Sequence, residues 1–468
     1  MTGPSTAIHL IRIMPAKGAR MELIVGGGIV GLSVAWRLSR AGRPVTVVDP
    51  APASGASHAA AGMLAPVSEV TYTEEPLLRL GVASLRRWPS FAAELAADAG
   101  LPPGALAPSP APSGGRSPAA SGAPSHGGPG APSHGGPGAP SHGGPGAPSY
   151  GLDFRADGTL DVAFGTDDLA ALDELAAFMG KLGLPVERLT GRECRRLEPM
   201  LAPSVRGGLL APGDAWVDPR RVTSALLAAL ERRGVPVVRA RVSRLLRASG
   251  GSGEGAVVGV ELDDAAGGGA VPAEIQADGV VLAAGVWSAE LAGVPVRPVK
   301  GQIMRLRSAE PLLSRCVRGV VHGTPVYLVP RGDGELVVGA TQEEMGFDTR
   351  VTAGGVYELL RDARELVPGV TELEVAEVVA GLRPGTPDNL PLIGPSGTPG
   401  LTLATGHHRG GVLLAPLTAA LLQGEEPELA ALCAPDRHHP ASGSGGPRAS
   451  RGPAAPPYDE TSGSKEMG

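Results

Sequence analysis

The chain has few cysteines and no long apolar run. Its three cysteines, Cys194, Cys316 and Cys433, are widely spaced along 468 residues. Their number is odd and no two have the spacing of metal ligands, which favours free thiols in a reducing cytoplasm over a disulfide framework or a metal site. No stretch of about eighteen apolar residues occurs, which excludes a transmembrane helix. The apolar segment near the start is broken by Arg12, and no small-residue cleavage site follows it, so we expect no signal peptide.

An excess of positive charge is also missing, as are the common short catalytic motifs. The formal net charge is -6 and the pI is about 6.0, which argues against a nucleic acid or an anionic membrane as a partner. There is no G-x-S-x-G, no Walker loop and no zinc-ligand spacing. We therefore expect demanding chemistry to come from a bound cofactor.

Residues 21–50 carry the clearest positive signal. A short apolar run predicts a buried strand, and Gly26, Gly28 and Gly31 follow it as G-x-G-x-x-G. The first glycine permits a tight turn, the second lets a pyrophosphate approach the backbone, and the third lets helix and strand pack closely. The helix behind this turn directs its first N–H groups at the phosphates. A second strand ends at Asp49, whose carboxylate can accept from ribose hydroxyls, so the motif favours FAD or NAD over NADP without choosing between them.

Parts of the chain lack the pattern of a packed core. We expect disorder in an N-terminal extension, an internal insertion and a tail: residues 1–20, 102–149 and 435–468. Residues 123–146 repeat A-P-S-H-G-G-P-G three times, and this composition cannot bury enough apolar surface to fold. His126, His134 and His142 recur in the repeat and could gather a metal ion, but a solvated surface insertion is favoured. No metal is therefore expected.

The remainder predicts an α/β protein with two kinds of sheet. The nucleotide-binding motif needs a parallel sheet, whereas alternating strands between about residues 299 and 341 suggest a separate antiparallel one. Further strands are expected at residues 158–164, 236–247, 257–262 and 279–285, and helices at residues 75–99, 167–183, 219–233 and 354–366.

Several polar residues near the C-terminal end are candidates for a site. Arg383 stands at the end of an apolar strand before a proline–glycine turn, where it can form either a carboxylate clamp or a structural ion pair. Arg409 lies in the glycine-flanked turn G-H-H-R-G-G, whose N–H groups can meet an anion or a ring edge. His407 and His408 have no third ligand nearby in the sequence, so a metal role is disfavoured. Tyr327 is mid-strand, and either a core position or a hydroxyl turned towards substrate fits it.

Taken together, these blocks resemble the FAD-dependent D-amino-acid oxidase family, and within it the glycine-oxidising enzymes of bacterial thiamine biosynthesis. The motifs that carry the resemblance run from about Met21 to Leu432: GGGIVGLSVAWRL, AAAGMLAP, DAWVDPRR, VLAAGVWS, PVKGQ, YLVPR, VVGAT, GLRPGTPDNLPLIGP and ATGHHRGGVLLAP. The resemblance implies a two-domain flavoprotein with a Rossmann-like FAD-binding domain and an antiparallel-sheet substrate domain, both discontinuous in sequence. The implied bounds are 21–85, 214–297 and 380–434 for the first domain, and 86–213 and 298–379 for the second.

The resemblance also assigns residues. Family members contact FAD at positions that match Gly26, Gly28, Ile29, Val30, Gly31, Asp49, Pro50, Ala56, Ser57, Ala61, Gly62, Met63, Val242, His407, His408, Arg409, Gly410, Gly411, Val412 and Leu413. On composition alone the small-residue stretch from Pro50 to Pro66 would read as an Ala-rich helix start, and the resemblance turns it into part of the flavin site. Family members hold the substrate carboxylate with residues that match Arg383 and Arg409, beside a tyrosine that matches Tyr327.

The implied reaction is the oxidation of glycine or a small amine by hydride transfer to the flavin. Oxygen then takes the electrons, giving hydrogen peroxide, and water converts the imine to glyoxylate and ammonia. A D-amino-acid or sarcosine oxidase remains an alternative, as does a non-catalytic flavin-binding scaffold. The resemblance further implies a homo-oligomer. No cysteine lies near Arg383, where sarcosine oxidases attach flavin, so non-covalent FAD is expected. Gln342 in place of a methionine and Gly410 in place of an asparagine depart from the family pattern.

Overall fold

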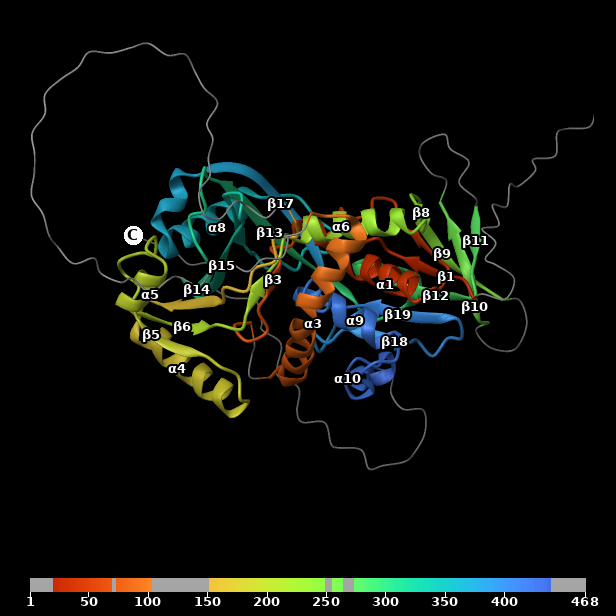
Figure 1. Ribbon diagram of the computed structural model, residues 1–468, viewed down its shortest axis with the longest axis horizontal. Coiled ribbons are helices and arrows are strands. Elements are labelled where there is room, and N and C mark those ends of the chain that lie inside the picture. The colour runs from red at the N-terminus through yellow and green to blue at the C-terminus, as the bar shows by residue number, and fades with distance from the viewer. Residues whose placement is uncertain (1–19, 70–72, 103–150, 249–254, 264–272, 439–468) are drawn as a thin grey trace, which may run out of the picture.

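The computed structural model describes residues 20–69, 73–102, 151–248, 255–263 and 273–438. The predicted N-terminal extension and the repeat insertion lie almost entirely outside these residues. Figure 1 shows two large sheets, one towards each end of the long axis.

The first sheet has six strands in the order β18-β19-β12-β1-β2-β8. Its members come from four distant parts of the chain: β1 (Glu22–Val25), β2 (Val45–Val48), β8 (Val237–Val238), β12 (Gly279–Leu282), β18 (Leu392–Pro395) and β19 (Leu401–Thr405). All neighbouring pairs are parallel except β18 with β19. The predicted parallel sheet is thus present, and it is assembled from discontinuous segments.

Both faces of this sheet are buried, which explains the uninterrupted apolar character of its central strands. Ile24 and Val47 face a helical layer, whereas Leu23 and Val25 pack with residues of a small three-stranded sheet. The helices are α1 (Ile29–Arg40), α3 (Glu75–Ala99), α6 (Pro219–Arg232), α9 (Ala415–Leu421) and α10 (Pro427–Leu432). The small antiparallel sheet consists of β9 (Val242–Arg247), β10 (Val257–Leu262) and β11 (Glu274–Gln276).

The second large sheet has eight strands in the order β17-β13-β16-β15-β14-β4-β6-β5. The strands are β4 (Thr159–Ala163), β5 (Glu187–Thr190), β6 (Gly207–Ala211), β13 (Arg297–Arg307), β14 (Cys316–Val321), β15 (Thr324–Pro330), β16 (Glu335–Gly339) and β17 (Glu374–Gly385). The sheet is antiparallel as predicted, except that β4 and β14 pair in parallel. One face packs on α8 (Ala353–Leu366), and α4 (Thr166–Lys181) and α5 (Gly191–Leu197) flank its far end (Figure 1). We call it the substrate sheet.

Short elements join the two sheets. They are α2 (Ala56–Ala59), β3 (Met63–Leu64) and β7 (Ala215–Trp216), while α7 (Ser288–Ala292) lies against β9 of the small antiparallel sheet. β3 pairs with β7, and α2 lies against β17. The mixed α/β fold class is confirmed.

Three details differ from the sequence-based expectations. The single strand expected at 236–247 is divided, because β8 joins the parallel sheet and β9 joins the small antiparallel one. α3 runs unbroken through the expected domain boundary at 85/86, and its second half packs in the same core as α1 and α6 through Trp88 and Phe91. Ordered structure also extends four residues into the predicted tail, where Pro435–His438 forms a short helix.

Among the described residues, no helix is both long and apolar enough to cross a membrane. All three cysteines are buried and unpaired. Burial raises the pKa of the Cys194 thiol to about 11 and that of Cys433 to about 12, so both are uncharged thiols at neutral pH.

Candidate functional site

A cavity of about 590 Å³ lies between the parallel sheet and the substrate sheet. One part is lined by the glycine turn after β1, the end of β2 and the start of β9. Another is lined by α2 and the residues after it, and by the turn before α9. The substrate sheet contributes residues from β13, β15 and β17. The cavity thus lies outside the carboxyl ends of β1, β2 and β12, where open α/β sheets bind ligands.

The three glycines of the motif have different reasons to be glycine. A Cβ on Gly26 would lie 2.3 Å from the Ala283 carbonyl oxygen, and one on Gly31 would lie 2.0 Å from that of Gly26. These two residues are fixed by the packing of turn, helix and strand. A Cβ on Gly28 would meet only the Ser57 hydroxyl, at 3.4 Å, so the protein itself leaves this space open to the cavity. The open space at Gly28 fits a pyrophosphate that approaches the backbone.

The start of α1 and the end of β2 also fit a dinucleotide. The N-cap residue of α1 is Gly28, which has no side chain to cap the helix. The Ile29 N–H instead donates to the Ser57 hydroxyl at 2.9 Å. Asp49 lines the cavity while its carboxylate accepts from the Gly27 and Ala51 N–H groups at 2.6 and 2.7 Å. These bonds fix the orientation of the carboxylate at the strand end, which is the position from which ribose hydroxyls are recognised.

The small-residue stretch forms a loop over the cavity. It holds the four-residue helix α2 and then turns at Gly62 into β3. A Cβ on Gly62 would lie 2.0 Å from the Val217 carbonyl oxygen, and its φ is +84°, so only glycine suits this turn. Ala56, Ser57 and Met63 line the cavity. We call residues 56–63 the small-residue loop.

Arg383 projects from β17 into the same cavity. Its Nη1 donates to the carbonyl oxygens of Lys300 and Thr341, at 3.3 and 3.2 Å. The guanidinium lies over Gly301 of β13, where a Cβ would come within 2.3 Å of both terminal nitrogens. Gly301 therefore leaves the space that the Arg383 guanidinium occupies. Sequence reasoning missed this role, although PVKGQ was among the motifs.

Tyr327 lies on the same face of the substrate sheet and also lines the cavity. Its ring covers Gly339 of β16, its cross-strand partner, where a Cβ would lie 2.4 Å from the hydroxyl oxygen. Burial raises the pKa of Tyr327 to about 12, although the positive charge of the neighbouring Arg383 acts to lower it. The phenol is therefore neutral at physiological pH and can donate a hydrogen bond.

Arg409 lines the cavity but is engaged elsewhere as well. Its Nη2 forms an ion pair with Glu74 and donates to the main-chain oxygen of Glu69 at 3.4 Å. Glu74 also accepts from the Asn389 amide at 2.7 Å. The geometry therefore distinguishes the two candidate arginines, because Arg383 bonds main-chain carbonyls and Arg409 is already paired with a carboxylate.

His407 and His408 are neutral at physiological pH. Burial lowers the pKa of His407 to about 3, and its Nε2 lies 2.9 Å from the Thr418 hydroxyl. Burial, followed by the charge of Arg409, lowers the pKa of His408 to about 4. Within the described ranges, no group of three or more potential ligands is arranged to hold a metal ion.

The structure brings most of the predicted site residues to this one cavity. All line it except three: Gly31, Gly410 and Leu413. Gly31 packs against the turn, and the Leu413 carbonyl accepts from Ser84 and Trp88 in the middle of α3. Sequence reasoning missed further lining residues, among them Ala59, Ala60, Glu69, Ala284, Trp287, Gly301, Ile303 and Thr341.

The fold and the cavity fit a dinucleotide-binding protein in which a second sheet presents polar side chains to the same cavity. A family model described as FAD dependent oxidoreductase matches residues 23–116 and 147–423. The chain belongs to this FAD dependent oxidoreductase family, and its cofactor is FAD, which confirms the cofactor expected from the sequence.

Individual relatives agree with this assignment. The bifunctional protein ThiO/ThiG of Trichormus variabilis is 33% identical over 406 residues, which cover 86% of this chain and 51% of that protein. The glycine oxidase of Geobacillus kaustophilus is 30% identical over 407 residues, covering 85% of this chain and 90% of that protein. The crystal structure of glycine oxidase from the same organism aligns with a TM-score of 0.70 and 28% identity, over 90% of this chain and 100% of that one. The chain spans about half the length of the ThiO/ThiG relatives it matches.

Proposed function

We propose that the protein is a glycine oxidase that acts in the thiazole branch of thiamine biosynthesis. The observation that carries the proposal is the placement of Arg383 and Tyr327 on one sheet face, directed into the cavity that also holds the dinucleotide turn. The names of the relatives, glycine oxidase and ThiO, support the same activity. The overall reaction is glycine, oxygen and water giving glyoxylate, ammonia and hydrogen peroxide.

The residues of the chain bind and orient the substrate. Arg383 holds the carboxylate of the amino acid, and the neutral Tyr327 hydroxyl donates a second hydrogen bond to it. FAD, when bound, supplies the acceptor for the hydride that leaves the substrate Cα. No protein base is required for this step once the amine is neutral and held in place, so the rate depends on positioning.

Arg409 takes a secondary role in this proposal. Its ion pair with Glu74 neutralises much of its charge, so it attracts the carboxylate less strongly than Arg383, which anchors it. Gln342 lines the cavity where the family resemblance implies a methionine, and we propose that it tunes tolerance for a substituent on the substrate.

The test is spectroscopic and kinetic. The purified protein should be yellow, glycine should bleach the flavin under anaerobic conditions, and peroxide should form with glycine faster than with sarcosine, D-alanine or D-proline. A faster reaction with one of the latter would assign a D-amino-acid or sarcosine oxidase instead. Flavin that none of these amines bleaches would leave the scaffold alternative and contradict the proposal.

A substitution of the anchor tests the site itself. Arg383→Ala should lower kcat/KM for glycine by a factor of about a hundred or more, since a charged hydrogen-bond pair contributes about 1.5–3 kcal/mol and the substrate would also lose its orientation. The flavin absorbance should remain. Loss of FAD from this variant would mean that Arg383 belongs to the cofactor site.

Further features belong to the same proposal. We propose that FAD is bound without a covalent link, that the protein is a cytoplasmic homo-oligomer, and that the two domains are those expected from the sequence, with the first boundary drawn after α3. Sheet membership supports the discontinuous division, because the parallel sheet takes strands only from residues 22–48, 237–282 and 392–405.

A further inference from the structure

Three arginines that do not line the cavity contact the main chain of the small-residue loop. Arg220 donates through Nε to the His58 carbonyl oxygen at 2.9 Å. Arg305 donates through Nη2 to the carbonyl oxygens of His58 and Ala60, each at 3.4 Å. The Nη2 of Arg331 donates to the Ala61 carbonyl oxygen at 2.5 Å. The loop that lines the cavity is thus held by cationic side chains at three of its carbonyl groups.

Two of these arginines are fully buried and come from the substrate sheet. Arg305 is 1% exposed and Arg331 is 2% exposed. Arg305 lies on β13, which also carries Gly301, the glycine that Arg383 packs over. Arg331 directly follows β15, the strand that carries Tyr327. The strand that carries Tyr327, and the strand that pairs with the one carrying Arg383, therefore also lead to the arginines that hold the loop beside the flavin site.

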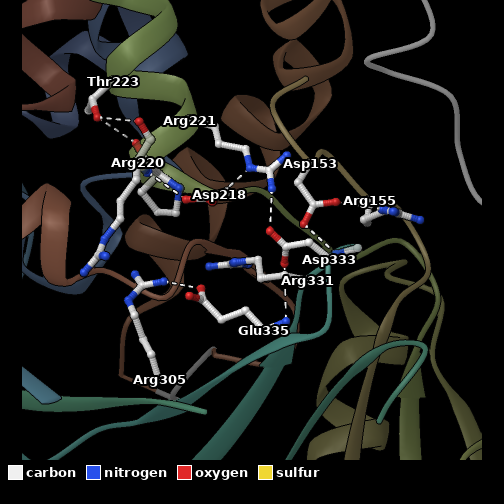
Figure 2. A network of polar contacts seen from close by, with 12 residues as sticks. Asp153, Arg155, Asp218, Arg220, Arg221, Thr223, Arg305, Arg331, Asp333 and Glu335 are labelled. Atoms are coloured by element: carbon white, nitrogen blue, oxygen red, sulfur yellow. Dashed lines mark hydrogen bonds and ion pairs between the residues drawn. The ribbon is translucent and has the colours of Figure 1, made fainter. Parts of the chain in front are cut away.

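Pairing in this cluster is uneven. Arg305 bonds Glu335 at 2.5 Å, and Arg220 bonds Glu377 at 2.6 Å. Figure 2 shows Arg331 among the same network, close to Asp333 and Glu335. Within the part of the chain that the structure describes, Nε and Nη1 of Arg331 have no hydrogen-bond partner.

Buried arginines with unpartnered nitrogens lower the stability of the fold. A buried guanidinium loses its hydration, and unpartnered nitrogens leave that cost uncompensated. Burial lowers the pKa of Arg305 despite the opposing charge of Glu335, and the charges of Arg220 and Arg331 lower it further. The contact that Arg331 does make, with the Ala61 carbonyl, therefore explains its position better than a contribution to the fold.

We propose that Arg331, supported by Arg305 and Arg220, is a positioning residue that fixes the small-residue loop, and with it the flavin, relative to the substrate-binding face of the substrate sheet. The inference rests on the proposed function for its kinetic consequence and on FAD binding for its direct one. Arg331 touches neither the cavity nor the reacting atoms, since it acts through the main chain of Ala61.

The test compares Arg331→Met, Arg331→Lys and a control, Arg307→Met. Methionine has a similar volume but no charge, and lysine keeps a donor. Arg307 lies on β13 two residues beyond Arg305, and its side chain is 50% exposed. It approaches Glu335 only to 4.0 Å and makes no hydrogen bond to the loop. For each protein we would measure three quantities: the FAD dissociation constant of the apoprotein by flavin fluorescence, the rate of anaerobic flavin reduction at saturating glycine, and the midpoint of thermal unfolding of the apoprotein.

Arg331→Met should raise the FAD dissociation constant about tenfold, as expected for loss of one charged hydrogen bond. It should also slow flavin reduction, leave KM for glycine nearly unchanged and leave the unfolding midpoint of the apoprotein equal or higher. Arg331→Lys should recover part of the affinity, and Arg307→Met should match the wild type.

Three results would overturn the inference. One is a dissociation constant for Arg331→Met within about twofold of wild type. Another is an equal change in Arg307→Met. The third is a fall in the unfolding midpoint of the apoprotein that accompanies the loss of affinity, since that indicates a structural role only. The FAD measurement uses no substrate, so wild-type protein that binds FAD without oxidising glycine contradicts the proposed function and still tests this inference. Wild-type protein that binds no FAD contradicts both.

Discussion

Two glycines set the positions of the two polar side chains that the substrate sheet directs into the cavity. Gly301 lies under the Arg383 guanidinium, and Gly339 lies under the Tyr327 ring. Any larger residue at either place would occupy space that the polar side chain now fills. The substrate contacts are therefore shaped by residues that have no side chain of their own.

Gly301→Ala should displace Arg383 and raise KM for glycine about tenfold or more, because a charged hydrogen bond of about 1.5–3 kcal/mol is lost or weakened. FAD should stay bound, since the glycine turn after β1 and the small-residue loop are unaltered. Steady-state kinetics and the flavin spectrum measure both effects. Gly180→Ala is the matched control, because a Cβ there meets nothing within 4 Å. Unchanged KM in Gly301→Ala would mean that Arg383 is not the carboxylate anchor.

Gly339→Ala should move the Tyr327 ring in the same way. Its effect on KM should resemble that of Tyr327→Phe, and the double variant should be no worse than the single ones, since residues that act through one contact are not additive. Kinetics of the three variants check this expectation. Additive losses would show that Gly339 acts on something other than Tyr327.

The buried histidines predict a stability that depends on pH. His407 has a pKa of about 3 when folded and 6.5 when unfolded, so the unfolded chain binds its proton first as the pH falls. The free energy of unfolding therefore decreases below about pH 6.5, by about 1.4 kcal/mol at pH 5.5 from this residue. Asp214 acts in the opposite sense, because burial raises its pKa to about 7.

Comparison with His407→Gln separates these contributions. Urea unfolding at about pH 7.5 and about pH 5.5 should show that the variant loses less stability than the wild type on acidification, by about 1.4 kcal/mol. Asp214 is present in both proteins and its effect cancels. An identical pH dependence of the two proteins would contradict the burial of a neutral His407.

Arg383, Tyr327 and the glycine turn could be predicted from the sequence because each lies in a motif with its own chemical reason. The roles of Gly301 and Gly339, which leave space for Arg383 and Tyr327, could not be predicted from the sequence. These roles depend on strand register. β13 pairs with β17 so that Gly301 lies opposite a residue 80 positions later, and β15 pairs with β16 so that Tyr327 lies opposite Gly339, 12 positions later. The ion pair of Arg409 with Glu74 was missed for the same reason, since it joins a turn before α9 to the start of α3.

At the scale of elements, the turn between β1 and α1 separates requirements of folding from requirements of binding. Gly26 and Gly31 close the packing of strand, turn and helix, whereas Gly28 faces the cavity. The start of α1 therefore faces the cavity. It offers N–H groups and the positive end of the helix dipole to the phosphates of a ligand.

Gly28→Ala should fold normally and bind FAD more weakly, because its methyl group would occupy the cavity and not a protein contact. Gly31→Ala should instead lose stability by several kcal/mol, since its Cβ would overlap the Gly26 carbonyl. Circular dichroism and FAD titration distinguish the two. Equal stability of both variants would contradict this division.

The long helices α3, α4 and α8 were predicted close to their observed bounds, because they have clear amphipathic periodicity, whereas short elements such as β5, α5 and α7 were not predicted. Residues 236–247 were not divided correctly. The sequence there is a continuous run of β-forming residues, and only the positions of two different neighbouring sheets determine that it splits into β8 and β9. The parallel pairing of β4 with β14 is likewise a property of the assembled sheet.

At the scale of the whole molecule, the family match is interrupted and resumes around the repeat. It ends at residue 116 and begins again at 147. The repeat of residues 123–146 lies between these matched segments, and its own structure lies outside the described residues. Deletion of residues 123–146 should therefore leave peroxide production with glycine close to that of the full chain. A loss of more than about tenfold would show that the repeat takes part in activity.

The order of strands in the parallel sheet has a consequence for biosynthesis. β1 and β2 leave the ribosome first, but their neighbours β12 and β19 end only at Leu282 and Thr405, and the cavity is completed by residues up to Val412. Pairing of segments this far apart in sequence is slow and cannot begin before the later strand exists. The half-formed sheet must remain in the nascent chain with an unpaired apolar edge through most of translation. A ribosome-bound fragment that stops short of β19 should therefore not retain flavin.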